Sequence, residues 1–192
     1  MPAQQPKERA DAARNRRAIL DATRMLLVEH GADALSMDRV AAAAGVGKGT
    51  IFHRFGSRAN LLNALLAEPA ETLMSAIADG PPPLGPGAPA GERLLAFFDA
   101  MTVMMADNVE LMAAYRAVPM PPHPRTAEFH GTWDTHITAL LHESRPDIDA
   151  EAVGRLLLSS VGSDLAREMV RAGETDRLRA SIREMVQSVL RR

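Results

Sequence analysis

The sequence predicts an all-α fold of about nine helices, and two observations lead to this prediction. Strand signals are scarce, because only 4% of the 192 residues are aromatic and no apolar run alternates convincingly with polar residues. Apolar residues instead recur at spacings of three and four, which is the period of a helix with one buried face. A chain of this length suits one domain or two small ones with a sizeable core.

Four helices are expected in the first eighty residues, over about 14–30, 36–44, 48–55 and 57–78. Gly31 is a typical C-terminal stop for the first helix, and Ser36 is a typical N-cap for the second. Gly45 supplies the left-handed residue that ends the second helix. Pro69 is expected to kink the fourth helix rather than end it, because the apolar period continues beyond it.

A loop and five further helices are expected in the remainder of the chain. Residues 80–91 read GPPPLGPGAPAG, a composition that excludes regular structure. The later helices are expected over about 92–107, 109–118, 126–144, 149–172 and 175–190, with the segment PMPPHP closing the second of them. No internal repeat is visible.

The charges are distributed unevenly along the chain. Residues 1–60 carry ten Lys or Arg and six Asp or Glu, whereas residues 61–192 carry twelve and eighteen. The excess of basic residues in 1–60 suggests that this N-terminal part binds an anionic partner. The chain has no cysteine, which excludes thiolate nucleophiles and cysteine zinc sites, and it has neither a signal peptide nor an apolar run that could cross a membrane. We therefore expect a cytoplasmic protein.

The segment AAAAGVGKGTIFHRF, residues 41–55, contains a Gly-Lys-Gly-Thr that is suited to phosphate. A nucleotide-binding P-loop is excluded, because Ala42 and Gly49 stand where that motif needs Gly and Ser or Thr, and because the preceding segment favours helix over strand. Two short helices joined by a glycine turn instead form a helix-turn-helix pattern, whose second helix can enter the major groove of DNA. Gly47 and Gly49 would let this backbone approach the sugar-phosphate surface, and Lys48 would meet phosphate as a point charge.

The stretch LSMDRVAAAAGVGKGTIFHRFGSRANLL, residues 35–62, resembles the DNA-binding signature of TetR/AcrR-family transcriptional regulators. The resemblance covers about the first third of the chain; beyond it only the helical architecture and the length are similar. It implies a disordered tail over 1–12, a DNA-binding domain over 13–60, and a ligand-binding and dimerisation domain over 61–192. It also implies that double-stranded DNA is the partner.

Several residues take DNA-binding roles by this resemblance. Phe52 stands where Tyr is usual, so a phenol hydrogen bond to phosphate is lost, and Gly47 stands where Ser or Thr is common. Arg58 replaces the usual Lys and suits phosphate. The expected contacts are Arg16, Arg17, Ser36, Met37, Gly47, Lys48, Thr50, Phe52, His53 and Arg58.

The last two expected helices suggest a homodimer. Residues 149–172 carry apolar side chains on more than one face, together with small residues such as Gly154 that permit close helix approach. Residues 175–190 carry a matching apolar stripe, so the two helices of each subunit would form a four-helix interface with two-fold symmetry. Two-fold symmetry in turn predicts a palindromic operator.

Methionine and aromatic residues suggest where a small hydrophobic ligand would bind. Flexible thioethers tolerate varied apolar guests, and ligand sites in helical bundles lie between helices. The expected ligand-binding residues are Phe97, Phe98, Met101, Met104, Met105, Met112, Tyr115, His130, Trp133 and Ile137. Ordinary core packing is the alternative explanation for each methionine.

The sequence gives no support for catalysis, a cofactor or a metal. His130, His136 and His142 recur every six residues, which does not place them on one helix face. We expect a one-component repressor whose ligand releases it from its operator. The alternatives are a DNA-binding regulator without a small-molecule inducer and a helical small-molecule carrier or enzyme.

Overall fold

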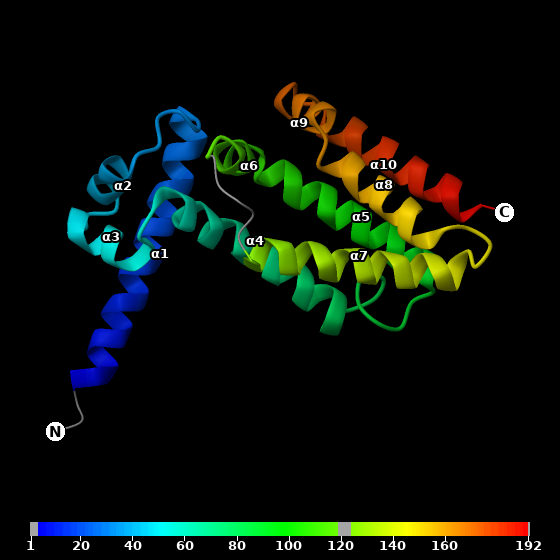
Figure 1. Ribbon diagram of the computed structural model, residues 1–192, viewed down its shortest axis with the longest axis horizontal. Helices are drawn as coiled ribbons and strands as arrows, with labels where there is room; N and C mark the ends of the chain where they lie inside the picture. Colours follow the sequence, from blue (N-terminus) through cyan, green and yellow to red (C-terminus); the bar gives the residue numbers. More distant parts are fainter. Residues whose placement is uncertain (1–3, 119–123, 192) are drawn as a thin grey trace. The chain divides into compact units, whose positions relative to one another are not determined.

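The computed structural model describes residues 4–118 and 124–191, which form ten helices and contain no strand (Figure 1). In chain order the helices are α1 (Gln4–His30), α2 (Met37–Ala43), α3 (Lys48–Phe55), α4 (Arg58–Asp79), α5 (Ala90–Asp107), α6 (Val109–Arg116), α7 (Pro124–Ser144), α8 (Ala150–Val161), α9 (Asp164–Arg171) and α10 (Thr175–Leu190). The all-α prediction is therefore confirmed. Within the described ranges, every helix is too short or too polar to cross a bilayer.

The chain divides into two compact units. The first comprises Met1–Leu66 and Glu110–Pro121, and the second comprises Ala67–Val109 and Pro122–Arg192. The division falls within α4, and it assigns α6 from Glu110 onward to the first unit. We expected a single boundary near residue 60, but apolar residues of α6 pack into the core formed by the N-terminal helices.

The first unit is built around apolar side chains that α1 to α4 and α6 direct inward. In each of these helices the buried residues recur about once per turn, which is the pattern of an amphipathic helix. The buried members include Ile19, Leu27, Val40, Ile51, Phe55, Leu61, Leu62, Leu65, Leu111 and Ala114.

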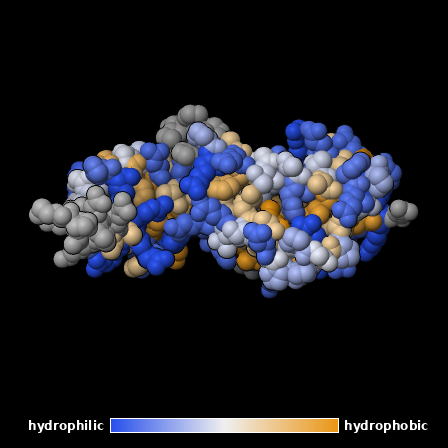
Figure 2. Space-filling model, turned by 90° about the horizontal axis from the view of Figure 1, so that it is seen from below, coloured by the Kyte–Doolittle hydropathy of each residue, from blue (hydrophilic) through white to orange (hydrophobic). Residues whose placement is uncertain are grey.

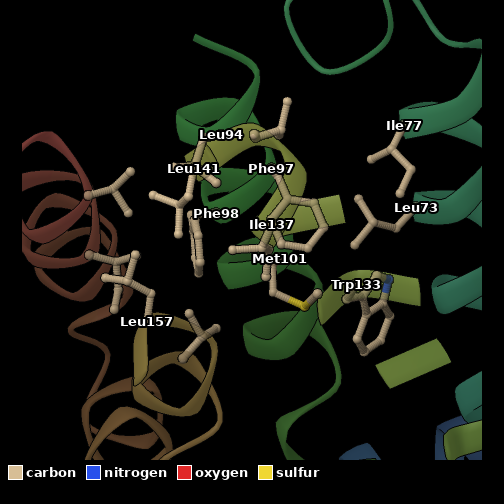
Figure 3. Close-up of a cluster of buried hydrophobic side chains, with 14 of the residues drawn as sticks. Leu73, Ile77, Leu94, Phe97, Phe98, Met101, Trp133, Ile137, Leu141 and Leu157 are labelled. Atoms are coloured by element: carbon tan, nitrogen blue, oxygen red, sulfur yellow. The ribbon is translucent and has the colours of Figure 1, made fainter. Parts of the chain in front are cut away.

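The second unit packs α5 against α7 and α10, and α7 against α8. Figure 3 shows Phe97, Phe98 and Met101 of α5 among Trp133, Ile137 and Leu141 of α7, with Leu73 and Ile77 of α4 alongside. Leu157 and Val161 of α8 and Leu178, Ile182 and Val186 of α10 complete this core.

The surface drawn in Figure 2 is mostly hydrophilic, and smaller hydrophobic areas show between the hydrophilic residues.

The segment expected to be one helix over 149–172 is two helices. α8 ends at Val161, and α9 begins after Ser163, whose side chain accepts a hydrogen bond from the Ala166 amide at 3.0 Å. The Gly162–Ser163 pair explains the break, because glycine is a poor helix former and serine competes for backbone amides as an N-cap.

Other helix limits also differ from expectation. α1 begins at Gln4, so residues 4–12, which we expected to be disordered, belong to a helix; the alanines and charged residues of this segment have good helix propensity. α5 begins at Ala90 rather than Glu92. Pro69 lies inside α4 without ending it, as predicted. Most of the segment PMPPHP lies outside the described residues.

Candidate nucleic-acid interface

The turn between α2 and α3 is held by local hydrogen bonds. The Ser36 side chain accepts from the Arg39 amide at 3.2 Å and so caps the start of α2. Gly45 has φ +65°, a left-handed conformation that favours glycine, and the Val46 amide then donates to the Ala41 carbonyl at 3.0 Å. The two short helices are therefore joined by the compact turn that the sequence predicted.

α3 has one buried face and one exposed face. Ile51 and Phe55 are buried in the core of the first unit, four residues apart. The remaining residues of the helix are exposed, including Lys48, Gly49, Thr50, Phe52, His53 and Arg54. A side-chain carbon built on Gly49 would meet nothing within 4 Å, so the backbone itself forms part of this open face.

Lys48 and Asp38 form an ion pair across the two short helices. Lys48 Nζ lies 2.8 Å from Asp38 Oδ1 and 2.9 Å from Oδ2, and both side chains are largely exposed. Lys48 Nζ also lies 5.9 Å from the centre of the Phe52 ring. Phe52 is 41% exposed, so its ring is available to an external surface.

Arg58 has a structural contact that we did not expect. Its Nη2 donates to the Ala32 carbonyl at 2.8 Å, which ties the start of α4 to the segment after α1. The side chain is half-buried, and its Nε is buried without a hydrogen-bond partner among the described residues. Arg58 is therefore engaged within the first unit rather than extended toward solvent.

The other expected contacts occupy different environments. Arg17 is exposed, whereas Arg16 is half-buried with its guanidinium carbon 6.0 Å from the centre of the Phe55 ring. Ser36 is exposed at the start of α2, and Met37 packs partly against the core. Sequence reasoning missed Arg54, an exposed cation in the last turn of α3 whose only signal was its position on the helix.

The expected ligand-binding residues do not form one group. Phe97, Phe98, Met101, Trp133 and Ile137 share the core of the second unit, and Met104 and Met105 are partly buried at its edge. The Phe97 and Phe98 rings meet edge to face with centroids 5.5 Å apart. Met112 and Tyr115 instead belong to α6 in the first unit, where Tyr115 packs against that unit's core. The methionines before and after residue 108 thus belong to different units, and a common site for them stays a prediction.

Of the histidines, His136 rather than His130 lies in the interior. His130 is exposed and meets the edge of the Trp133 ring, with centroids 5.3 Å apart. His136 is half-buried with its ring centroid 5.4 Å from that of Phe97, and burial together with the positive charge of Arg93 lowers the pKa of its imidazole. Among the residues that the structure describes, no three His, Asp or Glu side chains are grouped so as to hold a metal ion.

The expected dimerisation helices direct most of their apolar residues into their own unit. Leu157 and Val161 of α8 are buried there, and Gly154 faces α7, where an added side-chain carbon would lie 2.9 Å from Ile137 Cγ2. The small residue therefore serves a close contact inside the unit. Three large apolar side chains point outward, one from each of α8, α9 and α10: Leu156 (71% exposed), Leu165 (65%) and Met185 (43%).

Comparison with known proteins gives a consistent result for the N-terminal region. Residues 19–65 match the family model of bacterial regulatory proteins of the tetR family. The chain is 39% identical over 82 residues to the HTH-type transcriptional repressor LfrR of Mycolicibacterium smegmatis, a match that covers 43% of this chain and 42% of LfrR. It is 34% identical over 65 residues to the HTH-type transcriptional repressor AcnR of Corynebacterium glutamicum, covering 34% of this chain and 35% of AcnR. The matches thus span less than half the length of these curated relatives.

Solved structures resemble the chain over almost its whole length. A protein from Rhodococcus sp. that is assigned to the TetR family of transcriptional regulators superposes with a TM-score of 0.74 at 19% identity, covering 92% of this chain and 99% of that one. At this identity the likeness concerns the fold. The relatives matched by sequence are both HTH-type transcriptional repressors.

Proposed function

We propose that the chain is a TetR/AcrR-family regulator, and that it acts as a homodimeric transcriptional repressor that leaves a palindromic operator when a small hydrophobic ligand binds. The match of residues 19–65 to the tetR family model supports this proposal. Residues 4–66 would form the DNA-binding part, and the second unit would bind the ligand and the partner subunit. Such a repressor would act in the cytoplasm, where the chromosome lies.

The observation that carries the proposal is the orientation of α3. Ile51 and Phe55 anchor the helix in the core, which leaves the opposite face free to lie in a major groove. Lys48, Thr50 and His53 would contact phosphates or base edges from this face. Gly47 and Gly49 would let the helix backbone approach the sugar-phosphate surface, and the exposed Phe52 ring would pack against a sugar.

The remaining DNA contacts would position the helix. Ser36 and Met37 stand at the start of α2, which in a helix-turn-helix crosses the DNA backbone. The exposed Arg17 and the neighbouring Arg16 would add flanking phosphate contacts. Arg58 would act mainly by anchoring α4 through its bond to the Ala32 carbonyl. Phosphate contacts of this kind fix the register of the protein on DNA without reading sequence.

We place the subunit contact on the outward faces of α8, α9 and α10. Leu156, Leu165 and Met185 are large apolar side chains exposed to solvent, and burial against a second copy would remove them from water. A two-fold interface would present two α3 helices to two half-sites one helical turn of DNA apart.

The ligand would act through α4, because this helix contributes residues to both units. Leu73 and Ile77 of α4 belong to the same core as Phe97 and Trp133. A ligand that binds among these side chains and shifts α4 would change the operator affinity by its relative preference for the non-binding state. A preference of about 100-fold corresponds to about 2.7 kcal/mol.

The proposal is tested with a labelled duplex from the region upstream of the gene that encodes this chain. We expect specific binding whose association constant falls about 10³- to 10⁵-fold between about 50 and 200 mM salt, as counterion release requires for six to ten phosphate contacts. A thermal-shift panel of hydrophobic compounds then identifies a ligand, which should release the duplex. Binding that persists unchanged with every stabilising compound would favour a regulator without an inducer, and failure to bind duplex DNA at low salt would refute the proposal.

A further inference from the structure

Three buried nitrogen atoms in the second unit have no hydrogen-bond partner among the described residues. They are Arg93 Nε on α5, and Trp133 Nε1 and His136 Nε2 on α7. Trp133 is only 6% exposed. Trp133 and His136 are three residues apart on α7, so they share a helix face. Arg93 lies one turn before Phe97, whose ring is 5.4 Å from that of His136. The charge of Arg93 acts on His136, and His136 shares a face of α7 with Trp133, so the three nitrogens lie along the contact between α5 and α7, here called the seam.

Apolar side chains of α4 and α5 adjoin this seam. Figure 3 shows the indole nitrogen of Trp133 on the side of the ring nearer to Leu73 and Ile77 of α4. Arg93 also reaches α4, but its Nη2 meets the Ile77 carbonyl only at 3.5 Å, the outer limit of a hydrogen bond. No carboxylate among the described residues forms an ion pair with Arg93. Along the seam, the apolar side chains of Leu73 and Ile77 thus lie close to the Arg93 guanidinium, which has no carboxylate partner among the described residues.

The unpartnered groups define the polarity of a matching ligand. The Nε–H of an arginine and the indole N–H of a tryptophan can only donate hydrogen bonds. Buried donors without acceptors destabilise a protein, so an acceptor at this position is favoured. A neutral His136, which burial and the Arg93 charge favour, can donate or accept and so adapts to either requirement.

We infer that the second unit binds an amphipathic organic acid, whose carboxylate accepts hydrogen bonds from Arg93 and Trp133 while its apolar body packs on Leu73, Ile77 and Phe97. This inference rests on the proposed function, because it names the chemical class of the ligand expected there. It differs from that proposal in requiring a negative charge, because a neutral compound of the same size would leave the Arg93 guanidinium without a counter-charge.

Trp133 is the only tryptophan of the chain, so its fluorescence reports on this site directly. The full chain is titrated with n-alkyl carboxylates from hexanoate to hexadecanoate and with the n-alcohols of the same lengths. We expect at least one carboxylate to change the emission and to bind about tenfold or more tightly than its matched alcohol. Arg93→Gln should abolish this preference while leaving alcohol binding within about twofold, and Arg183→Gln, which alters an exposed arginine of α10, should preserve it.

Trp133→Phe provides a second test, because it retains an aromatic ring and removes only the donor. Measured by calorimetry, it should weaken the carboxylate more than the alcohol, and it decides the matter if Arg93→Gln does not fold. Equal affinities for carboxylates and alcohols, or no binding of any carboxylate, would overturn the inference. Neither result would affect DNA binding or release by another compound, which the duplex assay and the compound panel test separately.

Discussion

Lys48 Nζ lies 2.8 Å from Asp38 Oδ1, so the cation at the start of α3 is paired with an acidic residue of α2 on the surface that we assign to DNA. Phosphate would compete with this carboxylate for the same ammonium group. Asp38 would also repel the DNA backbone while stabilising α2 as an acidic residue in its first turn. The pair would thus lower the affinity of a DNA interface that includes Lys48.

Replacing Asp38 should accordingly strengthen DNA binding. We expect Asp38→Asn to tighten binding to a duplex by about two- to fivefold per subunit, the range that exposed ion pairs of up to about 1 kcal/mol allow. Fluorescence anisotropy at fixed salt measures the change. Asp33→Asn, which removes another exposed carboxylate of the first unit, controls for net charge. Equal gains from both variants would show that the Lys48 pair has no particular effect.

Phe52→Tyr should also increase DNA affinity. The ring is 41% exposed, so an added hydroxyl can reach outward without disturbing the core. One new hydrogen bond to phosphate is worth about 0.5–1.5 kcal/mol, which corresponds to about two- to tenfold in affinity per subunit. Phe129→Tyr in α7 makes the same chemical change in the second unit and should leave DNA binding unaltered. If the Phe52→Tyr variant binds DNA no better than wild type, the assignment of Phe52 to the DNA interface would be contradicted.

Gly154→Ala should destabilise the second unit. The new methyl group would lie 2.9 Å from Ile137 Cγ2, so either the Ile137 side chain or the two helices would have to move. We expect a loss of about 1–3 kcal/mol from overpacking, partly offset by the better helix propensity of alanine. Gly131→Ala is the matched control, because nothing lies within 4 Å of its added carbon, and thermal unfolding should show a small gain of stability there. Equal effects at both glycines would contradict the tight α7–α8 contact.

His136 should make the second unit less stable in acid. Its pKa is lowered in the folded state by burial and by Arg93, so the unfolded chain binds the proton more readily. The contribution of neutral His136 is thus present above the unfolded pKa of about 6.5, and it is lost as the pH falls from there toward the lowered folded value. His136→Phe should reduce the pH dependence of the melting temperature between about pH 7.5 and 5.5. His142→Gln, which alters an exposed position of α7, should leave that dependence unchanged. A wild-type melting temperature that rises on acidification through this range would contradict the assignment.

Charge on the outward faces of α8 and α10 should prevent dimer formation. Leu156→Glu and Met185→Glu each place a carboxylate on the surface where we expect the partner subunit, and burying an unpaired charge is costly. Sedimentation analysis should show monomers for both variants. Met25→Glu changes a similarly exposed apolar residue of the first unit and should leave the dimer intact. A dimer that survives both substitutions would place the subunit contact elsewhere.

The helix-turn-helix could be predicted closely from sequence, because its determinants are local. Ser36 caps α2, and Gly45 has the left-handed conformation that the turn requires. The buried residues of α3, Ile51 and Phe55, also follow from the apolar spacing within a single helix. The break after Val161 was missed since an apolar pattern continues through Gly162 and Ser163, and only the cap formed by Ser163 shows that a new helix begins.

The packing around the expected ligand-binding residues was harder to predict, because it depends on contacts between helices distant in sequence. Met112 follows Met105 by only seven residues, yet α6 belongs to the first unit and α5 to the second. Gly154 reads as a site of close helix approach, but the sequence does not say whether the neighbour is α7 or a second subunit. Arg93 and His136 belong to no recognisable sequence motif. Only the structure shows that each has a buried nitrogen without a partner and that His136 lies against Phe97.

The salt dependence of DNA binding by wild type and Lys48→Ala tests the central claim most directly. If the exposed face of α3 lies on the phosphate backbone, with one Lys48 from each subunit replacing a counterion, the slope of log association constant against log salt should become less negative by about 1.8 in the dimer. An unchanged slope in Lys48→Ala, on a duplex that wild type binds specifically, would show that DNA is held by another surface.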